Sequence, residues 1–355
     1  MTSPSPLIEC VPNFSEGRNM SVINAIGNAV SSVDGARLLN IEPDKDYNRT
    51  VVTFVGTRDA VVEAAFRATS VAAERIDMRF HSGEHPRLGA TDVVPFIPVS
   101  GVSMDDCIQL ARRFGERVSS ELKIPVYLYE FAASSPERRN LSDIRKGEYE
   151  GLESKLKDPA WTPDFGPAVF NAKSGATVTG ARKFLIAYNV NLATEETQIA
   201  QEIALRIRES GRVQKDAQGN PVKDARGKTL KIPGTLKSVK AMGVFLERHR
   251  IAQVSINLVD YSITSMHDAF EEVARLAKEL GTRVTGSELV GLSPLEAFRK
   301  ACRFYEPSFK GSDRDAVALA CKKLGLDQLE PFVADKKIIE FMIMDSLGHG
   351  SSTTI

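Results

Sequence analysis

The fold of this chain is most constrained by the order of its predicted strands and helices. Apolar strand patterns and amphipathic helix patterns follow one another in the same order twice along the chain. In the first half the order is strand, helix, strand, strand, helix, strand. The strands are predicted at residues 7–12, 36–42, 50–56 and 93–99, and the helices at about 22–30 and 59–76. A further helix (104–122), strand (126–129) and helix (142–156) extend this βαββαβ order, which is that of the ferredoxin-like split motif.

The second half repeats the pattern after a proline-rich crossover at 158–167. Strands are predicted at 183–191, 236–245, 252–259 and 283–286, and helices at 194–209, 267–280, 294–301 and 313–324. Residues 213–235 are polar and rich in Gly and Pro, which indicates an exposed flap or hairpin. The predicted fold is α/β (α+β), with two ferredoxin-like subdomains side by side and a ligand groove between them. The subdomains are predicted at 1–165 and 166–330, with a C-terminal tail or helix at 331–355.

Composition excludes several classes of partner. The 355 residues carry a formal net charge of zero, so no overall field attracts nucleic acid or an anionic membrane. No stretch is apolar enough to span a membrane, and the N-terminus has no signal-peptide pattern. The four cysteines are far apart in sequence, which indicates reduced thiols in a cytoplasmic protein. They are Cys10, Cys107, Cys302 and Cys321.

The segment from His81 to Asp92 concentrates reactive side chains and fits two incompatible chemistries. Its H-x-x-E-H spacing could bind zinc, but only on a helix that places both imidazoles on one face. Gly83 disfavours a helix, and Pro86 pushes the preceding residue out of the α region. No metal is therefore expected, and the alternative is metal-free acid–base catalysis by one histidine.

A second unusual segment runs from Ser174 to Lys183 and is rich in Gly and small hydroxyl residues. Such residues let the backbone approach a ligand closely. A P-loop is excluded because the segment lacks the required Lys-Ser/Thr pair and precedes a strand. A ligand-contacting loop and a tight turn with two surface cations, Arg182 and Lys183, both remain open.

Several long motifs resemble those of the glutamate formimidoyltransferase family. They include residues 7–17, Asn48-Arg49-Thr50-Val51, Gly83-Glu84-His85-Pro86-Arg87, Asp164-Phe165-Gly166-Pro167 and residues 175–187, in the same order, and the match extends to about Phe341. The resemblance implies transfer of the formimino group from N-formimino-L-glutamate to N5 of tetrahydrofolate, in histidine breakdown. It also implies folate in the groove between two subdomains, and a homodimer. The sequence ends near where an all-helical cyclodeaminase would begin in the bifunctional members, so only the first activity is expected.

The resemblance places the catalytic histidine at His85. The attacking N5 must lose a proton and the leaving glutamate nitrogen must gain one, and an imidazole with a pKa near ~6.5 can do both in turn. Glu84 or Asp92 could orient the ring. A carboxylate should stabilise the cationic amidinium, and Glu42 and Asp44 are the candidates.

The residues expected to bind ligands fall into two sets. The resemblance places the folate-binding segment at Gly166, Pro167, Ala168, Val169, Phe170, Asn171, Ala172, Lys173, Ser174 and Gly175. Cations suited to the carboxylates of glutamate and of the folate tail are Arg49, Arg87, Arg182 and Lys183.

Three alternatives stay open at this stage. The chain could bind folate without turnover, transfer a formyl group from N-formylglutamate, or be an H-x-x-E-H zinc hydrolase. The sequence also leaves open a polyglutamylated folate as substrate and a separate cyclodeaminase as partner.

Overall fold

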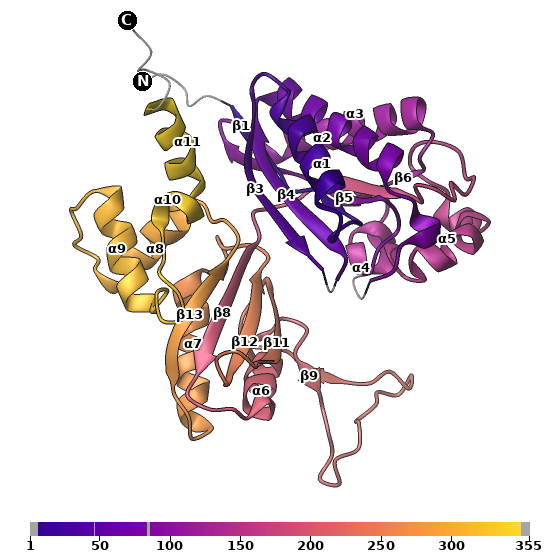
Figure 1. Cartoon of the computed structure of the whole chain (residues 1–355). Helices are drawn as coiled ribbons and strands as arrows, with labels where there is room; N and C mark the ends of the chain where they lie inside the picture. The colour runs from indigo at the N-terminus through magenta and orange to yellow at the C-terminus, as the bar shows by residue number, and fades with distance from the viewer. Residues whose placement is uncertain (1–5, 46, 84–85, 349–355) are drawn as a thin grey trace, which may run out of the picture. The chain divides into compact units, whose positions relative to one another are not determined.

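The computed structural model describes residues 6–45, 47–83 and 86–348, with 344–348 described by their backbone alone. The chain divides into two compact units, Met1–Lys183 and Phe184–Ile355, each with its own sheet and helices (Figure 1).

A seven-stranded sheet forms the centre of the first unit. Its strands are β1 (Leu7–Cys10), β2 (Asn13–Phe14), β3 (Ala36–Asp44), β4 (Arg49–Gly56), β5 (Thr91–Ser100), β6 (Val126–Glu130) and β7 (Thr177–Ala181). β1 and β2 act as one interrupted strand, because both pair antiparallel with β4 and β5. The order β3-β4-β1/β2-β5 is that of a ferredoxin-like sheet, and β7 and β6 extend it in parallel beyond β5. The βαββαβ fold predicted for this half is therefore confirmed.

Helices cover both faces of this sheet. Helices α1 (Met20–Ser31), α2 (Arg58–Arg75) and α3 (Met104–Leu122) bury one face around Phe54, Phe96 and Phe114. The short helices α4 (Leu141–Ile144) and α5 (Glu148–Leu156) cover the other face beside β6 and β7. Side chains along β6 point alternately to the two faces of the sheet. Val126 and Leu128 pack in the core under α1, α2 and α3, and Tyr127 and Tyr129 pack in the core under α4 and α5.

The glycine-rich segment after Ser174 is a strand rather than a turn. Residues Thr177–Ala181 are buried throughout and lie between β5 and β6. At Gly180 a Cβ atom would lie 2.3 Å from the Tyr129 carbonyl oxygen, so the absent side chain is needed for this packing. Residues 166–183 consequently belong to the first compact unit, whereas the sequence placed the subdomain boundary at 165/166.

One helix predicted at 142–156 is interrupted. Helices α4 and α5 are separated at Gly147, whose φ of 85° lies in the left-handed region. This break directs the following residues, Glu148 and Glu150, toward the loop described below.

The second unit has the same strand order on a smaller scale. Strands β8 (Ile186–Leu192), β11 (Val239–Leu246), β12 (Ile251–Leu258) and β13 (Val284–Val290) form an antiparallel sheet in the order β11-β12-β8-β13. Its helices are α6 (Thr197–Ile207), α7 (Met266–Glu279), α8 (Leu295–Tyr305), α9 (Asp313–Leu324), α10 (Ala334–Lys337) and α11 (Ile339–Gly348). The second predicted βαββαβ unit is thus also confirmed.

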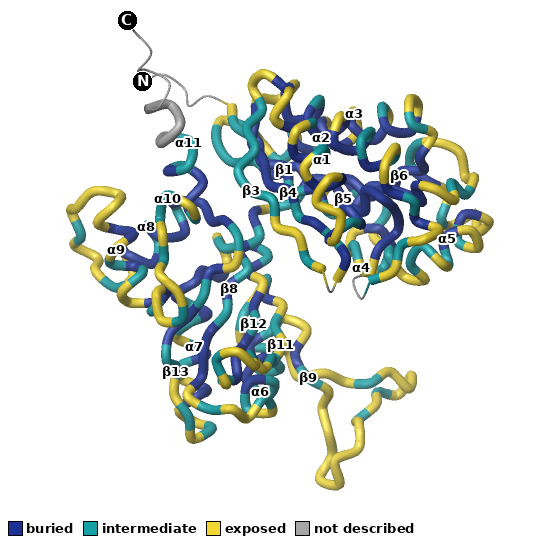
Figure 2. The backbone as a smooth tube through the Cα atoms, viewed as in Figure 1, coloured by how far each residue is buried: buried dark blue, intermediate teal, exposed yellow. Residues whose placement is uncertain are grey.

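The polar stretch after α6 forms the exposed hairpin that the sequence predicts. Its base is a separate two-stranded sheet of β9 (Arg212–Val213) and β10 (Lys231–Ile232), and most of its residues are exposed (Figure 2). Asp216 and Asp224 stabilise its two turns by accepting backbone N–H bonds at 2.8 to 3.0 Å. Within the described ranges, no helix combines the length and apolarity needed to cross a membrane.

We expect Arg138→Met to destabilise the first unit by about 3–5 kcal/mol, because it leaves the carboxylate of Asp164 buried without its cation. Arg138 donates to Asp164 at 2.9 Å and to the carbonyls of Ala160 and Thr162 at 3.1 and 2.7 Å. Denaturation followed by the fluorescence of Trp161, the one tryptophan, reports on this unit. The matched control is Arg139→Met at an exposed position, expected within about 0.5 kcal/mol of wild type. Equal midpoints for the two variants would contradict the expectation.

Candidate active site

The structure brings the two unusual sequence segments together. The amide of Ala90 donates to the Ser174 carbonyl at 2.9 Å, and the amide of Ala176 donates to the Leu88 carbonyl at 3.1 Å. A β-bridge joins Gly89 to Gly175 between these two bonds. The end of the His81–Asp92 segment therefore lies directly against the end of the segment expected to bind folate.

Glycine is needed on both sides of this bridge. A Cβ on Gly89 would lie 2.3 Å from the Ser174 carbonyl oxygen, and one on Gly175 would lie 2.1 Å from that of Leu88. Gly175 also has a φ of +66°, which side chains disfavour. The two backbones can approach this closely only because neither residue carries a side chain.

Arg87 is buried and fully engaged within the chain. Its Nη1 donates to Glu148 and Glu150 at 3.0 and 2.8 Å, and its Nη2 donates to Glu150 at 2.7 Å and to the His81 carbonyl at 3.3 Å. Burial opposes the charge of Arg87, but the bonds to Glu150 and Glu148 outweigh it and raise the Arg87 pKa. Its observed contacts hold the loop in place against α5.

His81 is held in one neutral tautomer. Its Nε2 lies 2.9 Å from the carbonyl of Asn48, which can only accept, so Nε2 carries the hydrogen. Its Nδ1 therefore accepts the N–H of Arg87 Nε at 3.3 Å. Burial, reinforced by the Arg87 charge, lowers the pKa of His81. Both ring nitrogens are occupied, which leaves this histidine poorly suited to move protons.

Asn48 is a residue whose importance the sequence reading missed. It adopts a positive φ of 48°, its Nδ2 donates to the Ser82 carbonyl at 2.8 Å, and its Oδ1 accepts the Gly17 amide at 3.0 Å. It thereby ties the loop to the β3–β4 turn. Its place within the family-like motif Asn48-Arg49-Thr50-Val51 is the one signal that could have drawn attention to it.

A cavity of about 450 Å³ opens beside this loop. It is lined by His81, Ser82, Gly83, Arg87, Gly147, Glu148 and Glu150. Two carboxylates and one guanidinium give the lining a negative balance, and an electron-poor or cationic group suits such a wall. Glu84 and His85 lie outside the described residues; on either side of them in sequence, the Ser82 carbonyl accepts from Asn48 and the Arg87 side chain bonds to α5.

The described neighbours of these two residues form no helix. Residues 81–83 and 86–87 have irregular backbone, as Gly83 and Pro86 predict. Among the side chains that the structure describes, no group of three or more His, Cys, Asp or Glu could hold a metal ion.

Of the acids and cations expected at the site, Asp44 and Arg49 lie at the turn beside the His81–Asp92 loop, whereas Glu42 does not. Asp44 accepts the Tyr47 amide at 2.9 Å and lies across the strand pair from Arg49, and this turn contacts Gly83. Arg49 donates to Asn13 at 3.3 Å, and burial lowers its pKa. Glu42 lies further along β3, where it is exposed and accepts a hydrogen bond from the side-chain Nδ2 of Asn40 at 2.8 Å.

Arg182 and Lys183 lie at the far end of β7 from Gly175. Seven residue steps, most of them in β7, separate Arg182 from Gly175, which is roughly 23 Å of extended chain. Arg182 instead donates through its amide to the Phe96 carbonyl at 3.2 Å. These two cations are therefore not brought together with the His81–Asp92 loop within the first unit.

The segment from Gly166 to Gly175 is exposed at its start and anchored at its end. Residues 166–169 are exposed, whereas the Phe170 ring packs 5.4 Å from that of Tyr149. The Tyr149 hydroxyl donates to the Ala172 carbonyl, and Lys173 donates to the Glu74 carbonyl at 2.6 Å. The ammonium of Lys173 is thus directed to helix α2.

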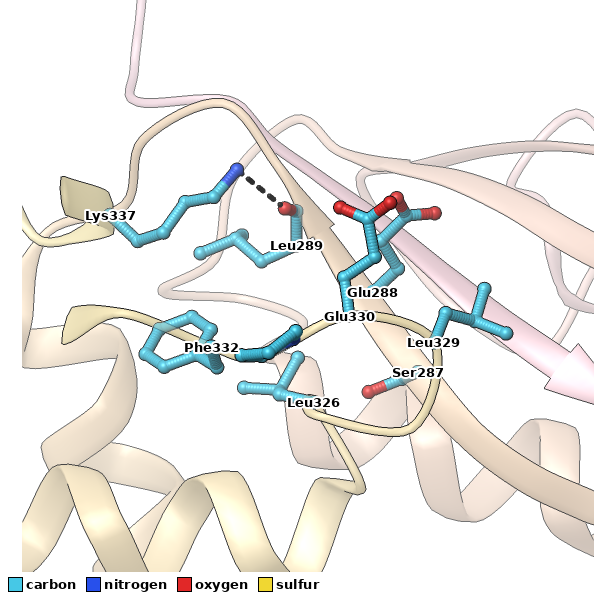
Figure 3. A pocket seen from close by; sticks show the side chains of 9 residues that line it. Ser287, Glu288, Leu289, Leu326, Leu329, Glu330, Phe332 and Lys337 are labelled. Carbon is cyan, nitrogen blue, oxygen red and sulfur yellow. Dashed lines mark hydrogen bonds between the residues drawn. The ribbon is translucent and has the colours of Figure 1, made fainter.

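The second unit holds a smaller cavity of about 70 Å³ between β13 and the loop after α9 (Figure 3). Glu288 and Glu330 lie on one side, and Lys337 donates to the Leu289 carbonyl at 3.3 Å. None of the expected catalytic or binding residues that the structure describes lines it.

Comparison with known proteins gives matches over both units. The N-terminal subdomain of the formiminotransferase domain matches residues 7–182, and the formiminotransferase domain matches residues 187–344. The chain is 50% identical to the formimidoyltransferase-cyclodeaminase of Rattus norvegicus, over 96% of this chain and 61% of that protein. It is 40% and 44% identical to the glutamate formimidoyltransferases of Streptococcus pyogenes serotype M1 and Thermoplasma acidophilum, over 84% of this chain and 93% and 92% of theirs. The chain thus spans less than two thirds of the first relative and nearly all of the other two.

We expect Gly89→Ala to destabilise the first unit by about 1–3 kcal/mol, because the new methyl group overlaps two carbonyl oxygens. The matched control is Gly151→Ala in α5, where a Cβ would meet nothing within 4 Å. That change should be neutral or stabilise by up to about 1 kcal/mol. Urea denaturation measures both, and an unaffected Gly89→Ala would mean that the bridge can open without cost.

A pH dependence of stability follows from His81. Because its pKa is lower in the folded than in the unfolded chain, its contribution is complete above about pH 6.5 and is lost as the pH falls toward the folded pKa. The wild type should therefore lose more stability than His81→Gln between about pH 7.5 and pH 5. His267, whose pKa is also lowered by burial, is present in both proteins and cancels. Parallel stability profiles would contradict the assignment.

Proposed function

The chain belongs to the formiminotransferase family, and from this we propose that it transfers the formimino group of N-formimino-L-glutamate to N5 of tetrahydrofolate. The products are 5-formimino-tetrahydrofolate and L-glutamate, as in histidine degradation. The observation that carries the proposal is the family match across both units. It is supported by the hydrogen bonds of Ser82 and Arg87, which hold the loop on both sides of the residues proposed for catalysis.

His85 is proposed as the general acid and base. N5 attacks the amidine carbon, and His85 accepts the N5 proton as the tetrahedral intermediate forms. The same imidazole then protonates the departing glutamate nitrogen, so proton and charge balance over the two steps. His81 is committed on both ring nitrogens, which supports assigning the moving proton to the other imidazole of the motif.

The acids beside the loop suit a cationic amidinium. Glu148 and Glu150 line the cavity, and Asp44 lies in the turn that contacts Gly83, so each could stabilise positive charge on the formimino carbon. Glu42 stays a second candidate from β3. Arg87 is proposed to position the loop, because its donors are already used within the chain.

Folate is proposed to bind along Gly166–Gly175, whose first residues are exposed and whose last residues lie against the catalytic loop. Arg49 is proposed to meet a carboxylate of one substrate, and Arg182 and Lys183 to meet the folate tail, with or without polyglutamate. A homodimer in the cytoplasm, and a cyclodeaminase acting on the product, complete the proposal.

Purified protein without added metal should release glutamate from formiminoglutamate only when tetrahydrofolate is present. We expect His85→Ala to lower kcat by about 10²–10⁴-fold, because proton transfer is lost. Mass spectrometry of the folate product and an assay of released glutamate measure the transfer. His249→Ala, in the turn between β11 and β12, is the matched control and should stay active.

Other outcomes would point elsewhere. Full turnover in His85→Ala would remove the assigned acid and base. Folate binding without glutamate release would replace the transferase by a binding protein. Stoichiometric zinc with activity lost to a chelator would favour a metallohydrolase.

A further inference from the structure

Arg87 and Arg138 of the first unit have largely buried side chains, and both are paired through several N–H groups. Arg87 bonds to two carboxylates and to His81 through Nε, Nη1 and Nη2. Arg138 bonds to Asp164, Ser134 and two backbone carbonyls. Such pairing is the rule for a buried guanidinium, since each unmet N–H donor costs free energy.

Arg145 is less completely paired than these two. Its side chain is only 15% exposed, and its Nη2 donates to the buried carboxylate of Asp92. Its Nε is buried and meets no acceptor, and its Nη1 has no hydrogen-bond acceptor in the part of the chain that the structure describes. The Nη1 group of Arg145 therefore retains N–H donors for an additional anion.

Arg145 lies in a cluster of charged side chains. Arg49 is close enough for the two charges to repel, and with burial as the larger cause this lowers the pKa of Arg49. The two guanidiniums share the field of Asp92, whose other oxygen already accepts the Leu88 amide at 2.9 Å. Asp44 also stabilises the charge of Arg49, so two carboxylates face the two cations, and an additional ligand would be held by the N–H groups of Arg145 that Asp92 does not use.

The position fits a substrate contact. Through Asp92 and Leu88, Arg145 is bonded to the base of the loop that carries His85. It also begins the connection that leads into the cavity wall at Gly147, Glu148 and Glu150. An anion bound at Arg145 would therefore lie close to the loop on which the reaction depends.

We propose that Arg145 binds a carboxylate of the glutamate portion of N-formimino-L-glutamate. The contact uses the guanidinium N–H groups that are not bonded to Asp92. This inference rests on the proposed function for the identity of the ligand. It makes Arg145 a residue that determines donor specificity, and it assigns the acid–base chemistry to other residues.

The test measures binding of N-formimino-L-glutamate by calorimetry in the absence of folate. Arg145→Lys keeps the charge that Asp92 requires but loses the planar fork of donors. We expect the donor Kd to rise about ten- to hundredfold, as for a lost charge-assisted hydrogen bond. The affinity for tetrahydrofolate and the melting temperature should stay near those of wild type.

A second variant distinguishes the loss of a ligand contact from a change in the structure around Asp92. Arg145→Met combined with Asp92→Asn removes both charges together and keeps an acceptor for the Leu88 amide. It should lose donor affinity in the same way. Lys146→Met removes the neighbouring exposed cation and is the control that should bind normally.

The outcomes separate the two proposals. An unchanged donor Kd in Arg145→Lys, or an equal loss of donor and folate affinity, overturns the role of Arg145. A wild-type protein that does not bind the donor overturns it as well. A wild-type protein that binds the donor in an Arg145-dependent way, yet transfers no group, supports this inference while the proposed function fails.

Discussion

The buried carboxylate of Asp92 joins the neighbouring loop and strand β5 to the α4–α5 connection, which lies 53 positions later in the chain. It stands at the start of β5, accepts the amide of Leu88 from the loop, and pairs with Arg145 from the connection between α4 and α5. Removing either partner would leave an unpaired charge in a site that is 2% exposed. The loop, the sheet and the α4–α5 connection therefore form one polar structure, and the cavity wall depends on it.

Around this carboxylate, residues of the same type have different roles. The N–H groups of Arg87 are hydrogen-bonded within the chain and stabilise the loop, whereas Arg145 has N–H groups without an acceptor. His81 is hydrogen-bonded to the Asn48 carbonyl and to the Arg87 guanidinium, so its role is structural, whereas His85 is proposed to transfer protons. Residue type alone could not separate these roles, because each is set by which neighbours the fold supplies.

The elements that local patterns determine could be predicted from sequence. Helices α3 and α9 begin and end where predicted, because Ser103 and Ser312 cap an unbroken apolar stripe. Strand β7 was missed because its small residues resemble a turn, and its strand character comes from pairing with β5 and β6. The kink at Gly147 and the role of Asn48 depend on positive φ angles that no periodic pattern reveals. The motif around His81 could be found, but its partners Glu148, Glu150 and Arg145 come from an element distant in sequence.

The parallel insertion of β7 also determines when this region can form during synthesis. Thr179 bonds to a residue of β5 that lies 85 positions earlier in the chain. The first four strands and two helices can assemble as soon as β5 emerges from the ribosome, since they contain a complete ferredoxin-like order. The Gly89–Gly175 bridge must wait until β7 has been translated. A nascent chain would therefore carry a folded core before the surface proposed for catalysis exists.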